Sequence, residues 1–542
     1  MVSFAMIMQN ELANPQDGRL GTTARPWHAP GYHEPFLAEK DRLRPLRSNT
    51  RKMAGKRTSA KPQSHRSFGQ GWPRWAALIL VLVSMRPRCL ALVVLALPLA
   101  ARGQTALEQA FRDWARDHVH PVASVPESPD DADLRPLGAM IGPASVVGFG
   151  EPVHDGHEPL AMRNRLLRHG VTRLGFTAVA LETCLSSSKR LYDHVLGRTT
   201  ETDGALKDAF CYGFGDYPEN LELVRWLRSY NAGQPPERKV RLYGIDLSGQ
   251  YFPSAYLSLE AVLDFLGRAD PALGRETRSR YADLIPIFRA DKYPKLTAAE
   301  KESCTGKIQD LIALVRRERT PLTAATSIDD YEWALRQAIS AAQDDAFLRS
   351  LPAQFDLGVP RWWEAFQPGK VWDYNAEMRE VAMADNVLWV QQRECRRGRV
   401  FYFAHDEHIQ AGPGILGSPG HPPAGQYRQI RGAGSYLRSA LGPDLVLIGT
   451  YFGHSEGFGA AAAPPQGVHE VEDLLGSLSV PQFFMDLRDL PAGGPLHDFF
   501  ATPHGTRASV VREADDTVAP LGAYDAIFYV NTLTPSPPAS KP

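Results

Sequence analysis

The chain has 542 residues, of which 43% are apolar and 22% charged, and its formal net charge at pH 7 is -1. This composition is typical of a folded globular protein, and the length allows a large catalytic domain with insertions. The near-neutral charge excludes the strongly basic balance of nucleic-acid-binding proteins, so we expect no nucleic-acid partner.

The N-terminal residues are predicted to lie outside the fold. Residues 1–84 begin with a long stretch rich in Pro, Arg, Ser and Gln, which indicates either disorder or an over-long translation. From Met85 the chain has a basic region, an apolar run and then small residues, which is the pattern of a secretory signal peptide over residues 85–103. We therefore expect a periplasmic or secreted protein without stable membrane insertion. The alternative is a membrane anchor over residues 75–99, which two central arginines disfavour.

Export would place the mature chain in an oxidising compartment. Four cysteines follow the predicted signal, namely Cys184, Cys211, Cys304 and Cys395. They contain no CxxC pair, which argues against a zinc site. One or two disulfides and four free thiols are both compatible with this spacing.

The most informative stretch runs from Val146 to Glu158. It has the pattern of a buried strand that ends at Glu151, a turn that carries His154, and the first turn of a helix. A second apolar run ends at Glu182, so strand, helix and strand predict a βαβ unit with two parallel neighbouring strands. Because ligands bind at the carboxyl ends of such strands, we expect Glu151 and Glu182 to face one crevice with His154 between them.

The remaining pattern alternates between helices and short apolar runs. Helices are predicted at residues 106–117, 186–196, 219–231 and 374–392, and further strands at 239–246, 399–404, 445–452, 483–487 and 526–530. Residues 254–349 have helical periodicity without strands. The sequence therefore predicts an α/β fold with a mostly parallel central sheet, helices on both faces, a large helical insertion and a cleft at the strand carboxyl ends.

Two segments have expectations of their own within a catalytic domain predicted to span residues 104–537. The loop Arg361–Glu364 is rich in aromatic residues and is expected to border a pocket. The Pro- and Ser-rich tail Thr534–Pro542 is expected to fray, with residues 538–542 flexible.

Polar side chains follow four of the predicted strands: Glu151 with His154, Glu182, Asp246, and His405 with His408. Histidine can deprotonate water near neutral pH, and a neighbouring carboxylate holds its tautomer and stabilises the resulting cation. His154 beside a glutamate fits this role. The second histidine pair can polarise a carbonyl or protonate a leaving group, and Arg163 can pair with the glutamates or stabilise an oxyanion. The set suits hydrolysis by activated water without a serine or cysteine nucleophile.

Other interpretations of the same residues stay open. His154 can cap a helix turn, His157 can face solvent, Glu158 can serve the dipole of the following helix, and Arg379–Glu380 can form an ion-paired helix face. His405 and His408 can be a satisfied structural pair.

Two chemical rivals also remain. A metal site is possible because the histidines and glutamates are all potential zinc or manganese ligands, although no HExxH motif is present. The segment Gly453–Gly457 matches the G-x-S-x-G nucleophile elbow, but glycines and prolines follow it where the elbow requires a helix.

Together these residues resemble the erythromycin esterase family. The resemblance covers roughly residues 107–535 and rests on Gly150-Glu151-x-x-His154-x-x-x-Glu158-x-x-x-x-Arg163, Glu182 at a strand end, Trp226-Leu227-Arg228-x-x-Asn231, Gly244-x-Asp246, Arg379-Glu380-x-x-Met383-Ala384-x-Asn386 and His405-x-x-His408. It implies an α/β fold with helical insertions around a deep cleft, and hydrolysis of an ester, in the named members a macrolide lactone, without metal or cofactor. By position it implies His154 as the general base, Glu151 and Glu182 as its carboxylate partners, and Arg163, His405 and His408 as the other site residues.

The chain departs from the family pattern around both histidine motifs. The family usually has a small hydroxyl residue before the first histidine and a glycine after it, whereas this chain has Val153 and Asp155 at these positions. At the second motif the family usually has His-Asn-x-His, whereas this chain has Asp406 in place of the asparagine. The two extra acids are expected to raise histidine pKa values or to attract a cation or a basic substrate. We therefore expect an exported hydrolase that cleaves a small-molecule ester or lactone, macrolide-type or similar. The alternatives are a metal-dependent hydrolase that uses the same residues and a non-catalytic envelope binding protein.

Overall fold

The computed structural model describes residues 106–123, 131–248, 255–351, 353, 372–414, 430–458, 470–505, 507 and 517–537. All of them belong to one compact unit, Arg86–Pro542. The predictions for residues 1–103, for the loop Arg361–Glu364 and for residues 538–542 lie outside the described residues.

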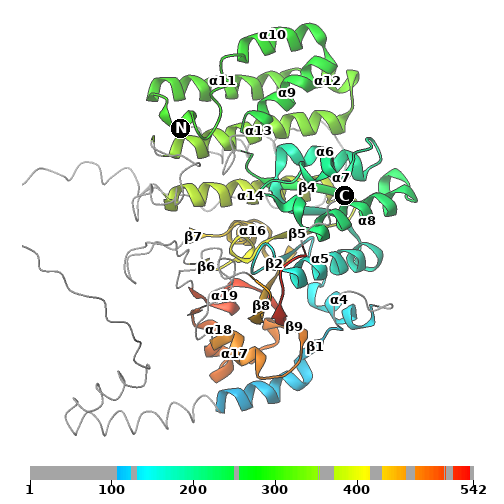
Figure 1. Cartoon of the computed structure of the whole chain (residues 1–542), viewed down its shortest axis with the longest axis vertical. Helices are drawn as coiled ribbons and strands as arrows, with labels where there is room; N and C mark the ends of the chain where they lie inside the picture. The colour runs from blue at the N-terminus through cyan, green and yellow to red at the C-terminus, as the bar shows by residue number, and fades with distance from the viewer. Residues whose placement is uncertain are drawn as a thin grey trace, which may run out of the picture. The chain divides into compact units, whose positions relative to one another are not determined.

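An eight-stranded sheet forms the centre of the fold, with the strand order β1-β9-β12-β8-β2-β5-β3-β4 (Figure 1). Every neighbouring pair from β12 to β4 is parallel, whereas β9 is antiparallel to β12 and to β1. The strands are β1 (Val119–Pro121), β2 (Val146–Glu151), β3 (Phe176–Cys184), β4 (Arg241–Asp246), β5 (Arg399–His405), β8 (Leu445–Ser455), β9 (Gln482–Asp486) and β12 (Ala526–Leu533). Two short ribbons pair β6 (Pro413–Gly414) with β7 (Ile430–Arg431), and β10 (His504–Gly505) with β11 (Thr517–Val518).

The central strands are continuous apolar runs because both faces of the sheet are covered. All six residues of β2 are buried, as are all but the first of β5 and of β4. This pattern is typical of parallel sheets packed between helix layers. In Figure 1, α14 (Trp372–Glu394) and α16 (Ala433–Leu441) lie on one side of the strands and α5 (His157–His169) on the other. The predicted α/β fold with a mostly parallel sheet is confirmed.

One topological prediction is wrong. The strands β2 and β3 are parallel and α5 separates them in sequence, but they are not neighbours, because β5 lies between them and pairs with both. Apolar periodicity indicates that a segment is a strand but does not select its partner. The insertion of β5 places the backbone of His405 directly beside Glu151 and brings the second histidine motif into the predicted crevice.

The helical insertion forms a layer with its own apolar core. It consists of α9 (Tyr256–Ala269), α10 (Pro271–Tyr281), α11 (Ala298–Arg317), α12 (Arg319–Ala325) and α13 (Ile328–Ser350), shown at the top of Figure 1. Among the described residues 255–351 every regular element is helical. The N-caps illustrate why these helices begin where they do: Thr297 forms a capping box with Glu300, and Asp270 and Ser327 accept hydrogen bonds from the first turns.

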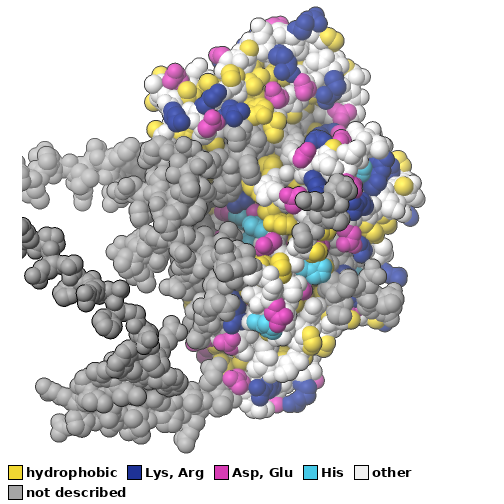
Figure 2. Space-filling view, viewed as in Figure 1, with side chains coloured by type: hydrophobic (Ala, Val, Ile, Leu, Met, Phe, Trp, Pro, Cys, Tyr) yellow, Lys and Arg dark blue, Asp and Glu magenta, His cyan; other side chains and the backbone are white. Residues whose placement is uncertain are grey.

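Other helices complete the unit. Residues 106–118 are helical, and the remaining α-helices are α4 (Arg135–Ile141), α6 (Leu185–Val195), α7 (Asp203–Lys207), α8 (Pro218–Ala232), α15 (Asp406–Ile409), α17 (Glu470–Gly476), α18 (Pro495–Ala501) and α19 (Pro520–Ala523). In the part of the chain that is described, no helix combines the length and apolar character needed to cross a bilayer. On the face shown in Figure 2, acidic and basic side chains of the described residues are interspersed.

The prediction that the chain frays from Thr534 onward is wrong for its first residues. The Thr534 carbonyl accepts a hydrogen bond from the backbone N–H of His157 (2.8 Å), and the backbone N–H of Ser536 donates to the Asp155 carbonyl (2.6 Å). Pro- and Ser-rich composition predicted fraying, but these tertiary hydrogen bonds hold the segment against the loop that carries His154.

Candidate active site

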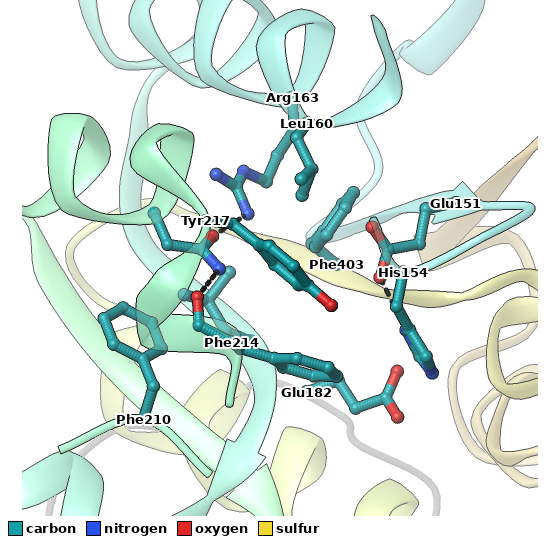
Figure 3. Close-up of a pocket in the computed structure, with 11 residues that line it drawn as sticks. Glu151, His154, Leu160, Arg163, Glu182, Phe210, Phe214, Tyr217 and Phe403 are labelled. Atoms are coloured by element: carbon teal, nitrogen blue, oxygen red, sulfur yellow. Dashed lines mark hydrogen bonds and ion pairs between the residues drawn. The ribbon is translucent and has the colours of Figure 1, made fainter. Parts of the chain in front are cut away.

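The loop between β2 and α5 brings the predicted base to the carboxyl edge of the sheet. Glu151, the last residue of β2, is buried, and its Oε1 lies 2.9 Å from Nδ1 of His154 (Figure 3). One potential ligand atom each of Glu151, His154 and Glu182 all lie within 4.8 Å of one another. The structure therefore places His154 beside both glutamates, as the sequence predicted.

A pocket with about 290 Å³ of open space adjoins this trio (Figure 3). Its lining residues combine aromatic and aliphatic walls with a few polar groups: Glu151, His154, Leu160, Arg163, Leu181, Glu182, Phe210, Phe214, Tyr217, Asn220 and Phe403. An apolar hollow with a small number of converging polar groups is the usual form of a small-molecule site.

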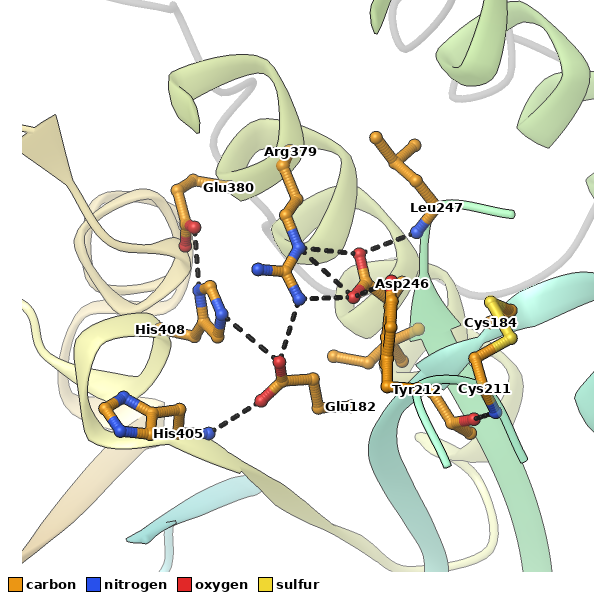
Figure 4. A network of polar contacts seen from close by, with 12 residues as sticks. Glu182, Cys184, Cys211, Tyr212, Asp246, Leu247, Arg379, Glu380, His405 and His408 are labelled. Atoms are coloured by element: carbon orange, nitrogen blue, oxygen red, sulfur yellow. Dashed lines mark hydrogen bonds and ion pairs between the residues drawn. A yellow bond between two sulfur atoms is a disulfide. The ribbon is translucent and has the colours of Figure 1, made fainter. Parts of the chain in front are cut away.

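Glu182 is the centre of a buried polar network (Figure 4). Its Oε1 accepts from Nη2 of Arg379 at 2.8 Å, and its Oε2 accepts from the backbone N–H of His405 at 2.8 Å. Arg379 also binds Asp246, at 3.0 Å through Nε and 2.6 Å through Nη2. The Arg379–Glu380 pair of α14 therefore does form an ion-paired helix face, and this face is buried, because Arg379 joins the ends of β3 and β4 in the interior.

The second histidine pair is fully engaged by protein groups. Nδ1 of His408 lies 2.7 Å from Glu380, and its Nε2 lies 3.3 Å from Glu182. His405 accepts a hydrogen bond at Nδ1 from the Glu407 backbone (3.2 Å), and its Nε2 lies 3.0 Å from the Pro152 carbonyl. His405 thus holds the start of the His154 loop and His408 holds Glu182. Direct action of either ring on a carbonyl or leaving group stays a prediction.

Burial and neighbouring charges set the protonation of these groups. Burial opposes a charge on His408, but Glu380 and Glu182 outweigh it and raise the pKa of His408 to about 10. Burial, with His154 nearby, holds the pKa of His405 well below its usual value. Burial alone would raise the pKa of Glu182, but His408, His154 and Arg379 hold it well below the usual range. At neutral pH the network therefore contains a charged His408, a neutral His405 and an ionised Glu182.

His154 and Glu151 form a second coupled pair. Burial raises the pKa of Glu151 to about 6, although the hydrogen bond from His154 opposes that rise. Burial opposes a charge on His154, but Glu182 and Glu151 outweigh it and raise its pKa. His154 is therefore a stronger base than an exposed histidine.

Arg163 is buried and lines the pocket, and its hydrogen-bond partners among the described residues are amide and backbone oxygens. Its guanidinium donates to the side chains of Asn164 (2.8 Å) and Asn220 (2.6 Å) and lies 4.8 Å from the ring centre of Phe403. Burial lowers its pKa to about 10, so it stays charged at neutral pH. Glu151 and Glu219 act on Arg163 through their charges without a direct ion pair among the described residues, and stabilisation of an oxyanion stays a prediction.

The two acids that depart from the family pattern do not act on the histidines as expected. The carboxyl of Asp406 is buried against Gly150 and Thr450, where its Oδ1 accepts the Thr450 backbone N–H (3.1 Å), and burial raises its pKa well above the usual value. An added side chain at Gly150 would meet this carboxyl at 1.9 Å, so glycine is required there. Asp155 contributes its carbonyl to Ser536. Neither acid is among the groups that raise the pKa of His154 or His408.

Sequence reasoning missed the pocket wall formed around the start of α8. Phe214, Tyr217 and Asn220 lie in a turn and at a helix N-terminus, outside any strand end. The density of aromatic residues directly after Cys211 was the available signal. Asn231, by contrast, is structural, because it bonds both backbone groups of Val240 and so ties α8 to β4.

One disulfide, Cys184–Cys211, joins the end of β3 to this wall (Figure 4). Cys304 is buried and Cys395 exposed, and both are free thiols. The G-x-S-x-G match is not a nucleophile elbow, because β8 continues through Ser455 and no helix begins before the described stretch ends at Phe458.

A parallel α/β sheet with a buried histidine–carboxylate cluster at the carboxyl ends of its strands defines an enzyme-type site. The erythromycin esterase family model matches residues 171–533, and the chain belongs to this family. It is an esterase-type hydrolase that acts on a small molecule. The matched region contains Glu182, His405 and His408 but begins after His154 and Arg163.

Known proteins resemble the chain over most of its folded part. It is 26% identical over 364 residues to an erythromycin esterase type II of Escherichia coli, covering 64% of this chain and 78% of that protein. A Bacillus cereus protein of known structure gives a TM-score of 0.64 at 21% identity, covering 80% of this chain and 99% of that one. A succinoglycan biosynthesis protein gives 0.61 at 22% identity, covering 80% and 98%. A variant of the erythromycin esterase EreC in its open conformation gives 0.56 at 17%, covering 78% and 98%. These structures share the fold.

Proposed function

We propose that the protein hydrolyses an ester or lactone, macrolide-type or similar, with a water molecule that His154 activates, without a metal or a covalent serine intermediate. The observation that carries this proposal is the hydrogen bond between Nδ1 of His154 and Glu151 at the edge of the pocket. It is the only hydrogen bond of this ring among the described residues, so Nε2 is available to a water.

The geometry supports a simple sequence of proton transfers. Glu151 accepts the Nδ1 hydrogen, so the Nε2 lone pair takes a proton from water as its oxygen attacks the carbonyl carbon. Glu151 and Glu182 stabilise the imidazolium that forms, and His154 then returns the proton to the leaving alcohol. Arg163 is the charged donor in the pocket best suited to the developing oxyanion.

The size of the pocket limits which part of a substrate it can hold. Its empty volume of about 290 Å³ includes open solvent, so the enclosed part of the hollow is smaller than the roughly 300–1,000 Å³ of pockets for drug-sized ligands. We propose that a compact apolar part of the ester enters between the aromatic walls while a bulkier part stays outside this hollow.

A metal-dependent hydrolase is the second candidate, and one observation favours it. Glu151, His154 and Glu182 present three ligand atoms in one cluster, and Oε2 of Glu151 is buried without a partner among the described residues. A set of one nitrogen and two oxygen ligands is suitable for zinc or manganese.

The deciding experiment is mass-spectrometric detection of a product with one added water, using a macrolide panel and simple lactones, with and without chelator. We expect hydrolysis that survives chelation and is lost in His154→Asn. Loss on chelation with recovery on adding zinc or manganese would favour the metal mechanism. Full activity of the variant would refute the base assignment, whereas turnover of any ester would eliminate the non-catalytic binding alternative.

We also propose export to the periplasm or outside the cell. The Cys184–Cys211 disulfide supports this, because structural disulfides persist in oxidising compartments. N-terminal sequencing of the mature protein tests it, and a start near residue 104 is expected.

A further inference from the structure

We propose that Thr534–Ser536, which we call the C-terminal strap, positions the His154 loop for catalysis. The strap follows β12, and it runs antiparallel to the loop between β2 and α5 through a bridge between Gly156 and Pro535. The inference rests on the proposed role of His154 as the base, and it assigns a function to residues outside the pocket.

Backbone hydrogen bonds fix the loop directly after His154. The Asp155 carbonyl accepts the Ser536 N–H at 2.6 Å, and the His157 N–H donates to the Thr534 carbonyl at 2.8 Å. The approach is close, because a side chain at Gly156 would meet Leu533 at 2.9 Å. The position of His154 on its loop therefore depends on a segment almost 400 residues away in sequence, roughly as a β-ladder fixes an edge strand.

Two carboxylates strengthen the same contact. Glu158, in the first turn of α5, accepts both the backbone N–H (2.7 Å) and the hydroxyl (2.6 Å) of Thr534. Glu219 is buried and bridges loop and strap, with one oxygen 2.6 Å from Nδ1 of His157 and the other accepting the Ser536 hydroxyl at 2.6 Å. Hydrogen bonds to an ionised carboxylate are stronger than neutral ones.

The bridge at Glu219 also reaches the pocket. Its neighbours Tyr217 and Asn220 line the hollow, and its carbonyl accepts hydrogen bonds from Arg163 (3.3 Å) and Asn164 (2.8 Å). The first turn of α8 therefore contacts the strap, the His154 loop and the buried guanidinium of Arg163. Release of the strap is expected to loosen the loop without removing any group from the pocket.

The test compares Ser536→Ala with the conservative Ser536→Thr, which keeps a hydroxyl for Glu219. Because small misplacements of a catalytic group cost up to about a hundredfold, we expect Ser536→Ala and Glu219→Gln to lower kcat by roughly tenfold to a hundredfold with KM little changed. Ser536→Thr should recover most of this. A matched control is Ser439→Ala, which removes a surface hydroxyl bonded to the Ser435 carbonyl.

Two further measurements separate positioning from general stability. Hydrogen exchange should accelerate at the amides of residues 155–158 and stay unchanged in β2 and β5. In a His154→Asn background, Ser536→Ala should cause no additional loss of kcat, because residues that act through one group are not additive.

Wild-type kcat in both Ser536→Ala and Glu219→Gln would overturn the strap proposal. So would a loss that persists undiminished in the His154→Asn background, since that indicates a purely structural role. Full activity of His154→Asn alone would instead refute the proposed base, which distinguishes failure of the function from failure of the strap.

Discussion

The buried network around Glu182 makes a prediction about stability that is independent of the substrate. Glu182→Gln keeps the shape of the side chain but removes the negative charge that faces Arg379 and His408. Because removal of one member of a buried ion pair leaves its partners uncompensated, we expect the variant to lose about 3–5 kcal/mol of unfolding free energy at pH 7.

The pH dependence of this effect follows from the shifted pKa of His408. The folded state raises that pKa from 6.5 to about 10, so the stabilisation is complete below pH 6.5 and is lost as the pH rises toward 10. The slope is at most about 1.4 kcal/mol per pH unit, or roughly 2–3 kcal/mol between pH 7 and 9. In Glu182→Gln only Glu380 still favours the charged imidazolium, so the pKa of His408 should fall and the stability lost between pH 7 and 9 should be roughly half that of the wild type. Glu182 itself has a depressed pKa, and its contribution is lost as the pH falls below about 4.5.

Urea denaturation at pH 7, 8 and 9 measures the unfolding free energy and its change with pH. Each value comes from the midpoint of the unfolding transition and its dependence on urea concentration. The matched control is Glu456→Gln, which removes the same kind of contact at the surface, where His454 and Glu456 are 50% and 65% exposed. That control should change stability by less than about 0.5 kcal/mol. An equal loss of stability between pH 7 and 9 in the wild type and in Glu182→Gln would refute the assigned protonation of His408.

Three further predictions concern the base and the disulfide. His154→Asn should lower kcat by about 10²–10⁴-fold while the melting temperature stays within a few degrees, as measured by steady-state assay and calorimetry. The acid limb of kcat/KM should have its midpoint above 6.5, because the raised pKa of His154 keeps it protonated to higher pH, and Glu151→Gln should move that midpoint downward; an unmoved limb would contradict the pairing. Replacing Cys184 and Cys211 by alanine should cost about 3.5 kcal/mol, from the entropy of a 27-residue separation, whereas Cys395→Ser should cost almost nothing.

Seven of the eight strands of the central sheet could be predicted from the sequence, but β1 and the order of the strands could not. Each apolar run at a predicted strand became a strand, with ends that shifted by a few residues, since buried parallel strands carry a strong local signal. The order depends on which helix layers pack against which strands, and no local pattern reports that. The insertion of β5 between β2 and β3 is the clearest case, because its position is decided by contacts with α14 and with both flanking strands.

The candidate site also has a part that the sequence predicts and a part that it does not. Glu151, His154 and Glu182 could be placed together because each lies at or just after the carboxyl end of a strand, and parallel strands share a carboxyl edge. One of the charges that keep Glu182 ionised comes from α14, where Arg379 is separated from Glu182 by 197 residues. The strap could not be predicted, because Pro- and Ser-rich composition indicates fraying and the partners of Thr534 and Ser536 are known only from the fold.

The network also explains how so much negative charge is accommodated around the proposed base, His154. Arg379 is shared between Glu182 and Asp246, and His408 is shared between Glu182 and Glu380, so three carboxylates are balanced by two cations. The negative charges of Glu182 and Glu151 favour the protonated form of His154, and the charge of His408 opposes it. A higher pKa makes the imidazole a stronger base toward water but reduces the fraction of the ring that is neutral at pH 7. We therefore expect the pH optimum of activity to lie on the alkaline side of neutrality. An acid optimum would therefore indicate that the protonated ring, and not the neutral one, is the form that acts.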